Sequence, residues 1–214
     1  MTALTLIIGN KNYSSWSLRP WLAMRQVGLE FTENRVPLDL PTTRAAILEH
    51  SPTGRVPALR DGAVQIWESL AICEYIAETY APSLWPTEPR PRAIARAVSA
   101  EMHAGFADLR ANMPLDCRSR YPRQGRTPAT LQDIERVLAL WQQCRQEFGQ
   151  DGPFLFGQFS IADAMYAPVV SRFVTYEVEL PAIARTYTET LWQLPAMQDW
   201  LHAAEQETEV LSLH

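Results

Sequence analysis

A group of small hydroxyl side chains follows the first apolar run of the chain, at a position suited to binding an anion. Leu4 to Ile8 is apolar, and Ser14, Ser15 and Ser17 come soon afterwards, where a helical pattern begins. The start of a helix presents free backbone N–H groups and the positive end of the helix dipole, so hydroxyls there favour a bound anion. Serine is also a preferred N-cap residue, and from these residues alone capping is the simpler interpretation.

Composition narrows the classes of protein to consider. The 214 residues carry a formal net charge of -5, with 47% hydrophobic and 20% charged residues, which is typical of a soluble globular protein. This balance gives no support to nucleic-acid binding, and the longest apolar run is too short to cross a membrane. Arginines gather at 118–126, but Pro122 and Gly125 there indicate a solvated loop.

The cysteines and the N-terminus favour a cytoplasmic protein. No basic region precedes Leu4, so the sequence predicts no secretory signal. The three cysteines are an odd number at wide spacing, and the four histidines show no metal-ligand pattern, so we expect neither a disulfide framework nor a metal site. The cysteines are Cys73, Cys117 and Cys144.

The elements that must position the serines are predicted from apolar periodicity and turn residues. Asp61-Gly62 between two apolar runs is a strong hairpin signal, and Cys73 falls on the apolar face of the helix that follows, where we expect it in the core. The expected elements are a strand at 2–8, a helix from 15–17 to 26, a strand at 31–38, a helix near 45–48, strands at 55–59 and 63–67, and a helix from 69.

A proline-rich stretch divides the sequence. Four prolines fall within residues 81–92, so we expect a linker at 82–92 between a first domain, 1–81, and a second, 93–214. Beyond the linker every long segment has helical periodicity, which predicts an all-α second domain. Its apolar stripes are Ile94, Val98, Met102, Phe106, Leu109 and Met113, and then Leu131, Ile134, Leu138, Trp141, Cys144 and Phe148.

The remaining helices have recognisable starts. Ser160-Ile-Ala-Asp163 matches a capping box with Asp in place of Glu, and opens a helix expected to reach about Phe173. Pro181 and Pro195 mark two shorter helices near the C-terminus.

This layout and four of its segments resemble the cytosolic glutathione transferases. Ser51-Pro-Thr-Gly-Arg-Val-Pro-Ala-Leu59 is similar to the segment of that family that carries a Val–cis-Pro bond. Glu68-Ser69 and the helix after it resemble the glutathione-binding helix start, Leu84-Trp85-Pro86 resembles the end of the first domain, and Phe159-Ser-Ile-Ala-Asp-Ala164 resembles the capping box of the second. The resemblance implies an α/β thioredoxin-like N-terminal domain, an all-α C-terminal domain, glutathione as co-substrate and a homodimer.

The first serine segment is most similar to one class of that family. Tyr13-Ser-Ser-Trp-Ser-Leu-Arg19 resembles the Ser-Ser-Cys-Ser motif of the zeta class, which includes maleylacetoacetate isomerases, but Trp16 stands where that motif has cysteine. The same difference argues against omega-type and beta-type enzymes, which place a cysteine at the sulfur of glutathione. By resemblance Ser15 is the favoured donor to that sulfur, Ser14 and Tyr13 are alternatives, and Ser17 and Arg19 are supporting residues.

The resemblance assigns the rest of the glutathione site. The backbone of Val56, ahead of a cis Pro57, would pair with the cysteinyl amide of glutathione. The Glu68 carboxylate would accept from the γ-glutamyl ammonium, and Ser69 would donate to its α-carboxylate. Two interpretations of Arg55 are equally consistent with the sequence: its side chain contacts the glycyl carboxylate of glutathione, or it is solvated.

The second substrate is expected between the domains, over the sulfur. Candidates for this pocket are Trp16, Trp21, His103, Phe106 and Leu109, although their helical spacing is equally that of a core stripe.

The resulting hypothesis is a cytoplasmic glutathione transferase that uses the thiolate of glutathione to attack a small electrophile. One alternative is a glutathione-dependent cis–trans isomerase of the maleylacetoacetate type. Another is a non-catalytic interaction protein on the same fold. We expect no metal, nucleic-acid or membrane partner.

Overall fold

A four-stranded sheet forms the core of the first part of the chain. The computed structural model describes residues 4–211. The strands lie in the order β2-β1-β3-β4, with β1 and β2 parallel and the other pairs antiparallel. Their bounds are Leu4–Ile8 for β1, Phe31–Arg35 for β2, Ala58–Asp61 for β3 and Val64–Trp67 for β4. This is the mixed sheet of a thioredoxin-like domain, as the resemblance implies.

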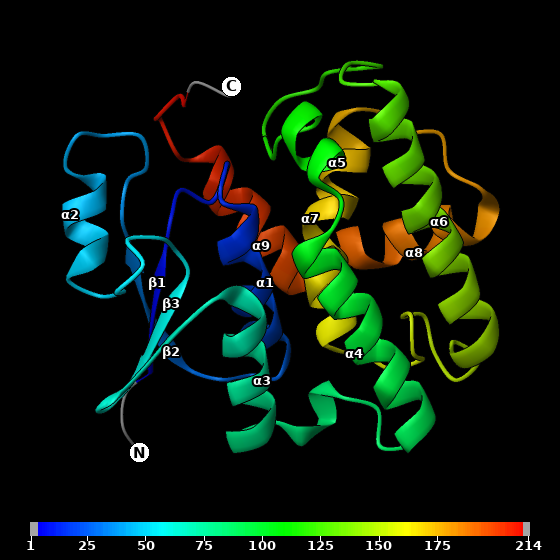
Figure 1. Ribbon diagram of the computed structural model, residues 1–214, viewed down its shortest axis with the longest axis horizontal. Helices are drawn as coiled ribbons and strands as arrows, with labels where there is room; N and C mark the ends of the chain where they lie inside the picture. Colours follow the sequence, from blue (N-terminus) through cyan, green and yellow to red (C-terminus); the bar gives the residue numbers. More distant parts are fainter. Residues whose placement is uncertain (1–3, 212–214) are drawn as a thin grey trace.

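Helices cover both faces of this sheet (Figure 1). Successive side chains of a strand point to opposite faces, and β1 uses both. Leu6 and Ile8 pack with α1 (Ser15–Gln26) and α3 (Ser69–Thr79), whereas Ile7 packs with Ile47 of α2 (Thr43–Leu48). The sheet therefore fixes the start of α1, where the serines lie, close to the start of α3.

As far as residue 211, the second part of the chain is built from helices and packs against α1 (Figure 1). Its central helix is α7 (Ile161–Thr175), in which 14 residues are buried and which contacts both α1 and α4. The other helices are α4 (Pro89–Ala104), α5 (Ala107–Asn112), α6 (Pro128–Phe148), α8 (Ala182–Trp192) and α9 (Pro195–Glu205). The predicted α/β plus all-α fold is confirmed.

Two details differ from the prediction. The apolar stripe that suggested one helix across 94–113 is two helices, because Gly105 is extended and Phe106 adopts the left-handed conformation with φ of 59°. The proline-rich stretch is also more ordered than a linker: a 3-10 helix, η1, covers Pro82–Leu84, and α4 begins at Pro89, since proline suits the first turn of a helix. Residues 2 and 3 of the first expected strand lie outside the described residues.

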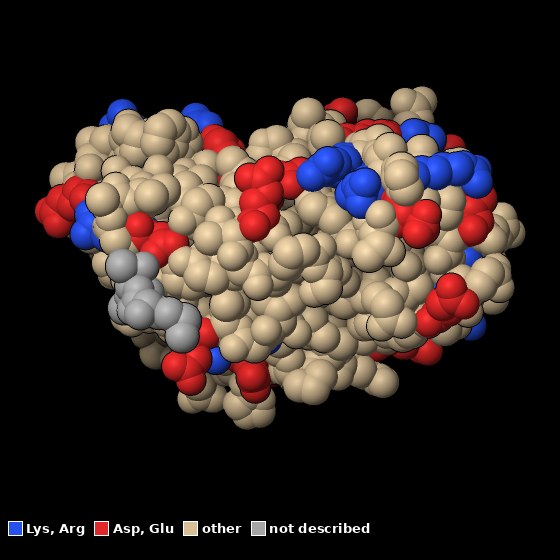
Figure 2. Space-filling view, turned by 90° about the horizontal axis from the view of Figure 1, so that it is seen from below, with Lys and Arg blue, Asp and Glu red and all other residues tan. Residues whose placement is uncertain are grey.

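The surface gives few further clues to function. Figure 2 shows acidic and basic side chains interspersed near the edges of one face, around a wide uncharged centre. Within residues 4–211, none of the helices is both long and apolar enough to cross a membrane. The same residues contain no cluster of His, Cys, Asp and Glu suited to a metal ion.

Candidate active site

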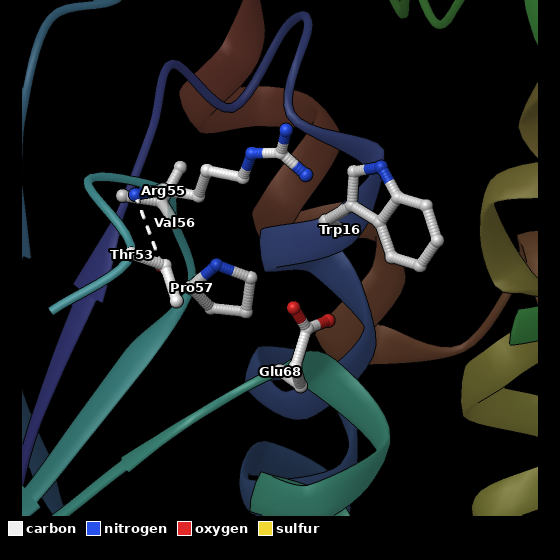
Figure 3. A pocket seen from close by; sticks show the side chains of 6 residues that line it. All are labelled: Trp16, Thr53, Arg55, Val56, Pro57 and Glu68. Carbon is white, nitrogen blue, oxygen red and sulfur yellow. Dashed lines mark hydrogen bonds between the residues drawn. The ribbon is translucent and has the colours of Figure 1, made fainter. Parts of the chain in front are cut away.

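A pocket of about 190 Å³ lies where the starts of α1 and α3 meet the loop before β3. Figure 3 shows the Trp16 ring on one side, Arg55 and Pro57 opposite it, and the Glu68 carboxylate directed into the space between them. Of the predicted glutathione-site residues, the structure therefore brings Arg55, Val56, Pro57 and Glu68 together. The lining residues are Trp16, Thr53, Arg55, Val56, Pro57 and Glu68.

The loop before β3 supplies most of the pocket wall. The Val56–Pro57 peptide bond is cis, as the resemblance implies. Thr53 also lines the pocket and was not predicted; its hydroxyl accepts from the backbone N–H of Arg55 at 3.3 Å (dashed in Figure 3) and shares a hydrogen bond of 2.9 Å with Ser51. A threonine inside a segment already assigned to a turn gave no separate signal in the sequence.

The start of α3 supplies the opposite edge. Glu68 is the N-cap residue and has φ of 70°, an uncommon conformation for any residue other than glycine. Such outliers gather at functional sites, where the surrounding structure holds them in place. Ser69 is completely buried at the first turn, and its hydroxyl has no hydrogen-bond partner among the described residues. The free Ser69 hydroxyl at a helix start suits an anionic group, whereas the Glu68 carboxylate suits a cationic one.

The three serines at the start of α1 have different hydrogen bonds. Ser14 donates to the hydroxyl of Ser17 at 2.7 Å, and that hydroxyl also accepts from the backbone N–H of Gly9 at 3.2 Å. Ser15 opens α1 and is 7% exposed, and none of the residues 4–211 hydrogen-bonds its hydroxyl. Ser14 and Ser17 therefore satisfy each other, while Ser15 keeps its donor free.

Tyr13 is directed to the second part of the chain. Its hydroxyl accepts from Nη2 of Arg118 at 3.0 Å, and the guanidinium lies 5.7 Å from the centre of its ring. Tyr13 is not among the residues that line the pocket, and neither are Ser14, Ser15, Ser17 and Ser69; of the start of α1, only Trp16 lines it.

A buried group of cations lies behind Trp16. The guanidinium of Arg19 is 1% exposed and lies 4.2 Å from the centre of the Trp16 ring, and its Nε and Nη1 atoms have no hydrogen-bond partner within the described part of the chain. Burial, and then the positive charges of Arg172 and Arg110, lower the pKa of Arg19 to about 9. An unpaired buried cation favours a negative charge nearby, which a thiolate or a carboxylate supplies.

His103, in the last turn of α4, lies beside this group. Its ring meets Trp16 edge-on at 5.3 Å, and Nε2 lies 3.7 Å from the Glu68 carboxylate. Burial and then the charge of Arg19 lower the pKa of His103 below its usual range, against the opposing effect of Glu68. His103 of α4 and Trp16 of α1 therefore meet where the two parts of the chain face each other, although His103 does not line the pocket.

Three other predicted pocket residues lie elsewhere. Trp21 is 1% exposed, packs against Trp200 at 5.1 Å and donates to Glu33 at 2.7 Å. Trp21 is five residues after Trp16, a rotation of about 140° around an α-helix, so the two rings leave the helix on different faces. Phe106 and Leu109 are core residues, 7% and 0% exposed, and neither lines the pocket.

The cysteines are core residues. Cys73 is fully buried, as predicted, and burial raises the pKa of its thiol to about 12. Cys117 and Cys144 are also buried, and burial raises the pKa of each thiol to about 12. A nucleophilic sulfur at this pocket therefore has to come from a ligand.

Two family models match the chain. The model described as glutathione S-transferase, N-terminal domain, matches residues 13–79, and the one described as glutathione S-transferase, C-terminal domain, matches residues 124–203.

Individual proteins agree with these matches. The chain is 31% identical over 189 residues to the probable maleylacetoacetate isomerase of Caenorhabditis elegans. The aligned region covers 85% of this chain and 85% of that protein. It is 30% identical to the protein IN2-1 homolog A of Oryza sativa subsp. japonica over 77% of this chain. It spans only 63% of that rice protein's length, and 64% and 62% of two glutathione S-transferases of Arabidopsis thaliana.

A solved structure extends the similarity to the whole fold. The glutathione transferase homolog of Burkholderia gl BGR1, with bound glutathione, superposes with a TM-score of 0.73 at 25% identity, over 96% of this chain and 100% of the other. With both family models and the C. elegans relative, this shows that the chain belongs to the glutathione S-transferase family.

Proposed function

We propose that this protein is a serine-type glutathione transferase in which Ser15 donates a hydrogen bond to the sulfur of glutathione. The observation that carries the proposal is the free hydroxyl of Ser15 at the start of α1, beside a pocket lined by Val56, Pro57 and Glu68. Ser14, the first alternative, already donates to Ser17, and the hydroxyl of Tyr13 accepts from Arg118 in the second part of the chain.

The remaining pocket residues match the polar groups of glutathione. The backbone of Val56 pairs with the cysteinyl amide, Glu68 accepts from the γ-glutamyl ammonium, and Ser69 donates to the α-carboxylate through the hydroxyl that otherwise lacks a partner. Arg55 and Thr53 lie where they can reach the glycyl end.

The magnitude of one hydrogen bond is sufficient for this chemistry. A free thiol has a pKa of about 8.5, and lowering it by about two units requires roughly 2.7 kcal/mol in favour of the thiolate. One hydroxyl donor to an anion supplies about 1.5–3 kcal/mol, and a helix start about 0.3–1 kcal/mol more. The charge of buried Arg19 acts in the same direction. No general base is required.

The reaction is a nucleophilic attack. The thiolate forms a carbon–sulfur bond with the electrophile, and either a leaving group departs with its electron pair or, in an addition, a proton is taken up at the neighbouring carbon. Trp16 lines the pocket and His103 packs against it, and we assign these two rings to the side from which a small electrophile approaches the sulfur. Trp16, at the position where the zeta-class motif has cysteine, makes this side aromatic.

The setting of the reaction is part of the same proposal. Membership of the glutathione S-transferase family supports a homodimer, and the three free, buried cysteines support a cytoplasmic protein. The division between domains falls at 82–92, and the ligands are glutathione and a small electrophile.

One observation favours a second candidate, glutathione-dependent cis–trans isomerisation. The unpaired guanidinium of Arg19 lies near Arg110 and Arg172, and such cations attract the carboxylates of a maleylacetoacetate-type substrate. The C. elegans relative carries the name of that isomerase.

Mass balance separates the two candidates. A transferase consumes one glutathione for each electrophile and releases a conjugate, whereas an isomerase leaves the glutathione concentration unchanged. Purified protein is incubated with glutathione and either an aryl halide or a maleylacetoacetate-type substrate, and free thiol and product mass are followed. Failure of the protein to bind immobilised glutathione contradicts both candidates and favours a non-catalytic interaction protein.

A further inference from the structure

The loop that leads to the serines is held by a residue from the far end of the chain. The two carboxylate oxygens of Glu207 accept from consecutive backbone N–H groups, Oε1 from Lys11 at 2.7 Å and Oε2 from Asn12 at 3.0 Å. The Glu207 side chain is 8% exposed, so water screens these charge-assisted hydrogen bonds little. The pairing spans 196 positions of sequence.

The backbone carbonyls of Lys11 and Asn12 also form hydrogen bonds with the second part of the chain. The Lys11 carbonyl accepts from the indole of Trp200 at 2.9 Å, and the Asn12 carbonyl accepts from the backbone N–H of Cys117 at 3.3 Å. The Asn12 side chain donates to Asp116 at 3.0 Å. All four backbone polar groups of these two residues therefore pair with the second part of the chain.

Arg118 connects the C-terminal segment that carries Glu207 to Tyr13, the residue after the Lys11–Asn12 pair. Its Nη1 donates to the carbonyl of Glu207, and its Nη2 donates to the carbonyl of Glu209 at 2.9 Å and to the hydroxyl of Tyr13 at 3.0 Å. Arg35 of β2 pairs with the carboxylates of Glu207 and Glu209 at 3.5 and 2.8 Å.

The loop transmits this constraint to the serines. The N–H groups of Tyr13 and Ser14 both donate to the carbonyl of Asn10, at 3.1 and 2.8 Å, so the chain makes a tight turn between Lys11 and the start of α1. Fixing Lys11 and Asn12 therefore fixes the direction from which Ser14 and Ser15 enter the helix.

We propose that Glu207 is a positioning residue for thiolate activation: it holds the loop at Lys11 and Asn12 so that the Ser15 hydroxyl is aimed at the sulfur. This inference rests on the proposed function. The groups assigned to grip glutathione, Val56, Glu68 and Ser69, lie on other segments that Glu207 does not contact. Loss of the Glu207 contacts is therefore expected to change the ionisation of bound glutathione more than its affinity.

The test compares Glu207→Gln with Glu205→Gln. Glutamine keeps the size of the side chain but replaces one carboxylate oxygen with an NH2 group. That group is a donor and faces a backbone N–H, so one of the two hydrogen bonds is lost. Glu205 is exposed, lies two residues earlier and makes no side-chain hydrogen bond or ion pair with the residues that the structure describes, so its variant serves as the control for the change of charge.

For Glu207→Gln we expect the thiol pKa of bound glutathione to rise by about half to one unit and kcat to fall roughly three- to tenfold, with the dissociation constant of glutathione within about twofold. Hydrogen exchange of the Lys11 and Asn12 amides should accelerate, and Glu205→Gln should match the wild type in every measurement. If Glu207→Gln does not fold, Glu207→Asp, whose shorter side chain reaches only one amide, is measured by the same criteria.

The outcomes separate this inference from the proposed function. A wild-type thiol pKa in Glu207→Gln, with Ser15→Ala raising it, overturns the positioning role alone. A parallel loss of affinity and stability with no change in thiol pKa assigns Glu207 a merely structural role and also overturns it. If the wild type does not lower the thiol pKa of bound glutathione, the proposed function itself fails.

Discussion

At the scale of single residues, the site combines satisfied and unsatisfied polar groups. Ser14 and Ser17 bond to each other, whereas Ser15, Ser69 and Arg19 keep donors without a partner among the described residues. The buried donors of Ser69 and Arg19 lack a partner, which costs roughly 1–3 kcal/mol each, so these two residues are suited to an anionic ligand.

His103 provides a test of this electrostatic environment. The pKa of His103 in the folded protein lies below the ordinary 6.5. As the pH falls through about 6.5, the unfolded chain therefore binds a proton at His103 more readily than the folded protein does, and the free energy of unfolding decreases. We expect the free energy of unfolding to fall less between pH 7.5 and pH 5.5 in His103→Gln than in the wild type. Urea denaturation at the two pH values measures this, and equal decreases in the two proteins would show that His103 does not carry the effect.

At the scale of elements, α1 and α7 form the centre of the molecule. α1 carries Trp16 and Arg19 toward the pocket and packs along α7, so the site depends on how α7 is anchored. Asp163 anchors the start of α7. Its carboxylate accepts from the backbone of Leu155 at 3.1 Å and of Ser160 at 2.8 Å, and from the hydroxyl of Tyr187 in α8 at 3.1 Å.

Removal of that carboxylate should destabilise the whole protein. In Asp163→Ala several buried donors lose their acceptor at once, and we expect a loss of about 3 kcal/mol or more in the free energy of unfolding. Asp199→Ala, an exposed aspartate of α9, should change it by no more than about 0.5 kcal/mol. Denaturant unfolding monitored by circular dichroism compares the two variants, and similar losses would contradict the anchoring role.

At the scale of the whole molecule, local motifs were predictable and long-range contacts were not. Val56-Pro57 and Glu68-Ser69 are adjacent pairs whose meaning lies in a short segment, and the structure brings them to one region. The local pattern at 118–126 predicts a solvated loop, and it gives no sign of the role of Arg118, because its partners Tyr13 and Glu207 are 105 and 89 positions away. The prediction that Trp21 lines the substrate pocket is wrong, since its ring is buried against Trp200. α1 is covered on more than one face, and the local sequence does not show which of its apolar residues face the pocket.

Ligand binding provides a test at this scale. A ligand that binds only the folded protein adds about 2.7 kcal/mol at a hundred times its dissociation constant, which raises Tm by roughly 5 to 10 °C for a chain of this size. We expect glutathione to do so for the wild type, and the double variant Glu68→Gln, Ser69→Ala to lose most of the rise. Differential scanning calorimetry with and without glutathione measures both, and an undiminished shift in the double variant would place the ligand elsewhere.

The central claim is that Ser15 lowers the pKa of the thiol of bound glutathione, and titration of the thiolate absorbance in the complex tests it most directly. The account predicts that Ser15→Ala raises that pKa by about one to two units, in line with the 1.5–3 kcal/mol of one hydroxyl donor, and that Ser14→Ala and Tyr13→Phe raise it less. A thiol pKa that stays at the wild-type value in Ser15→Ala would contradict the account.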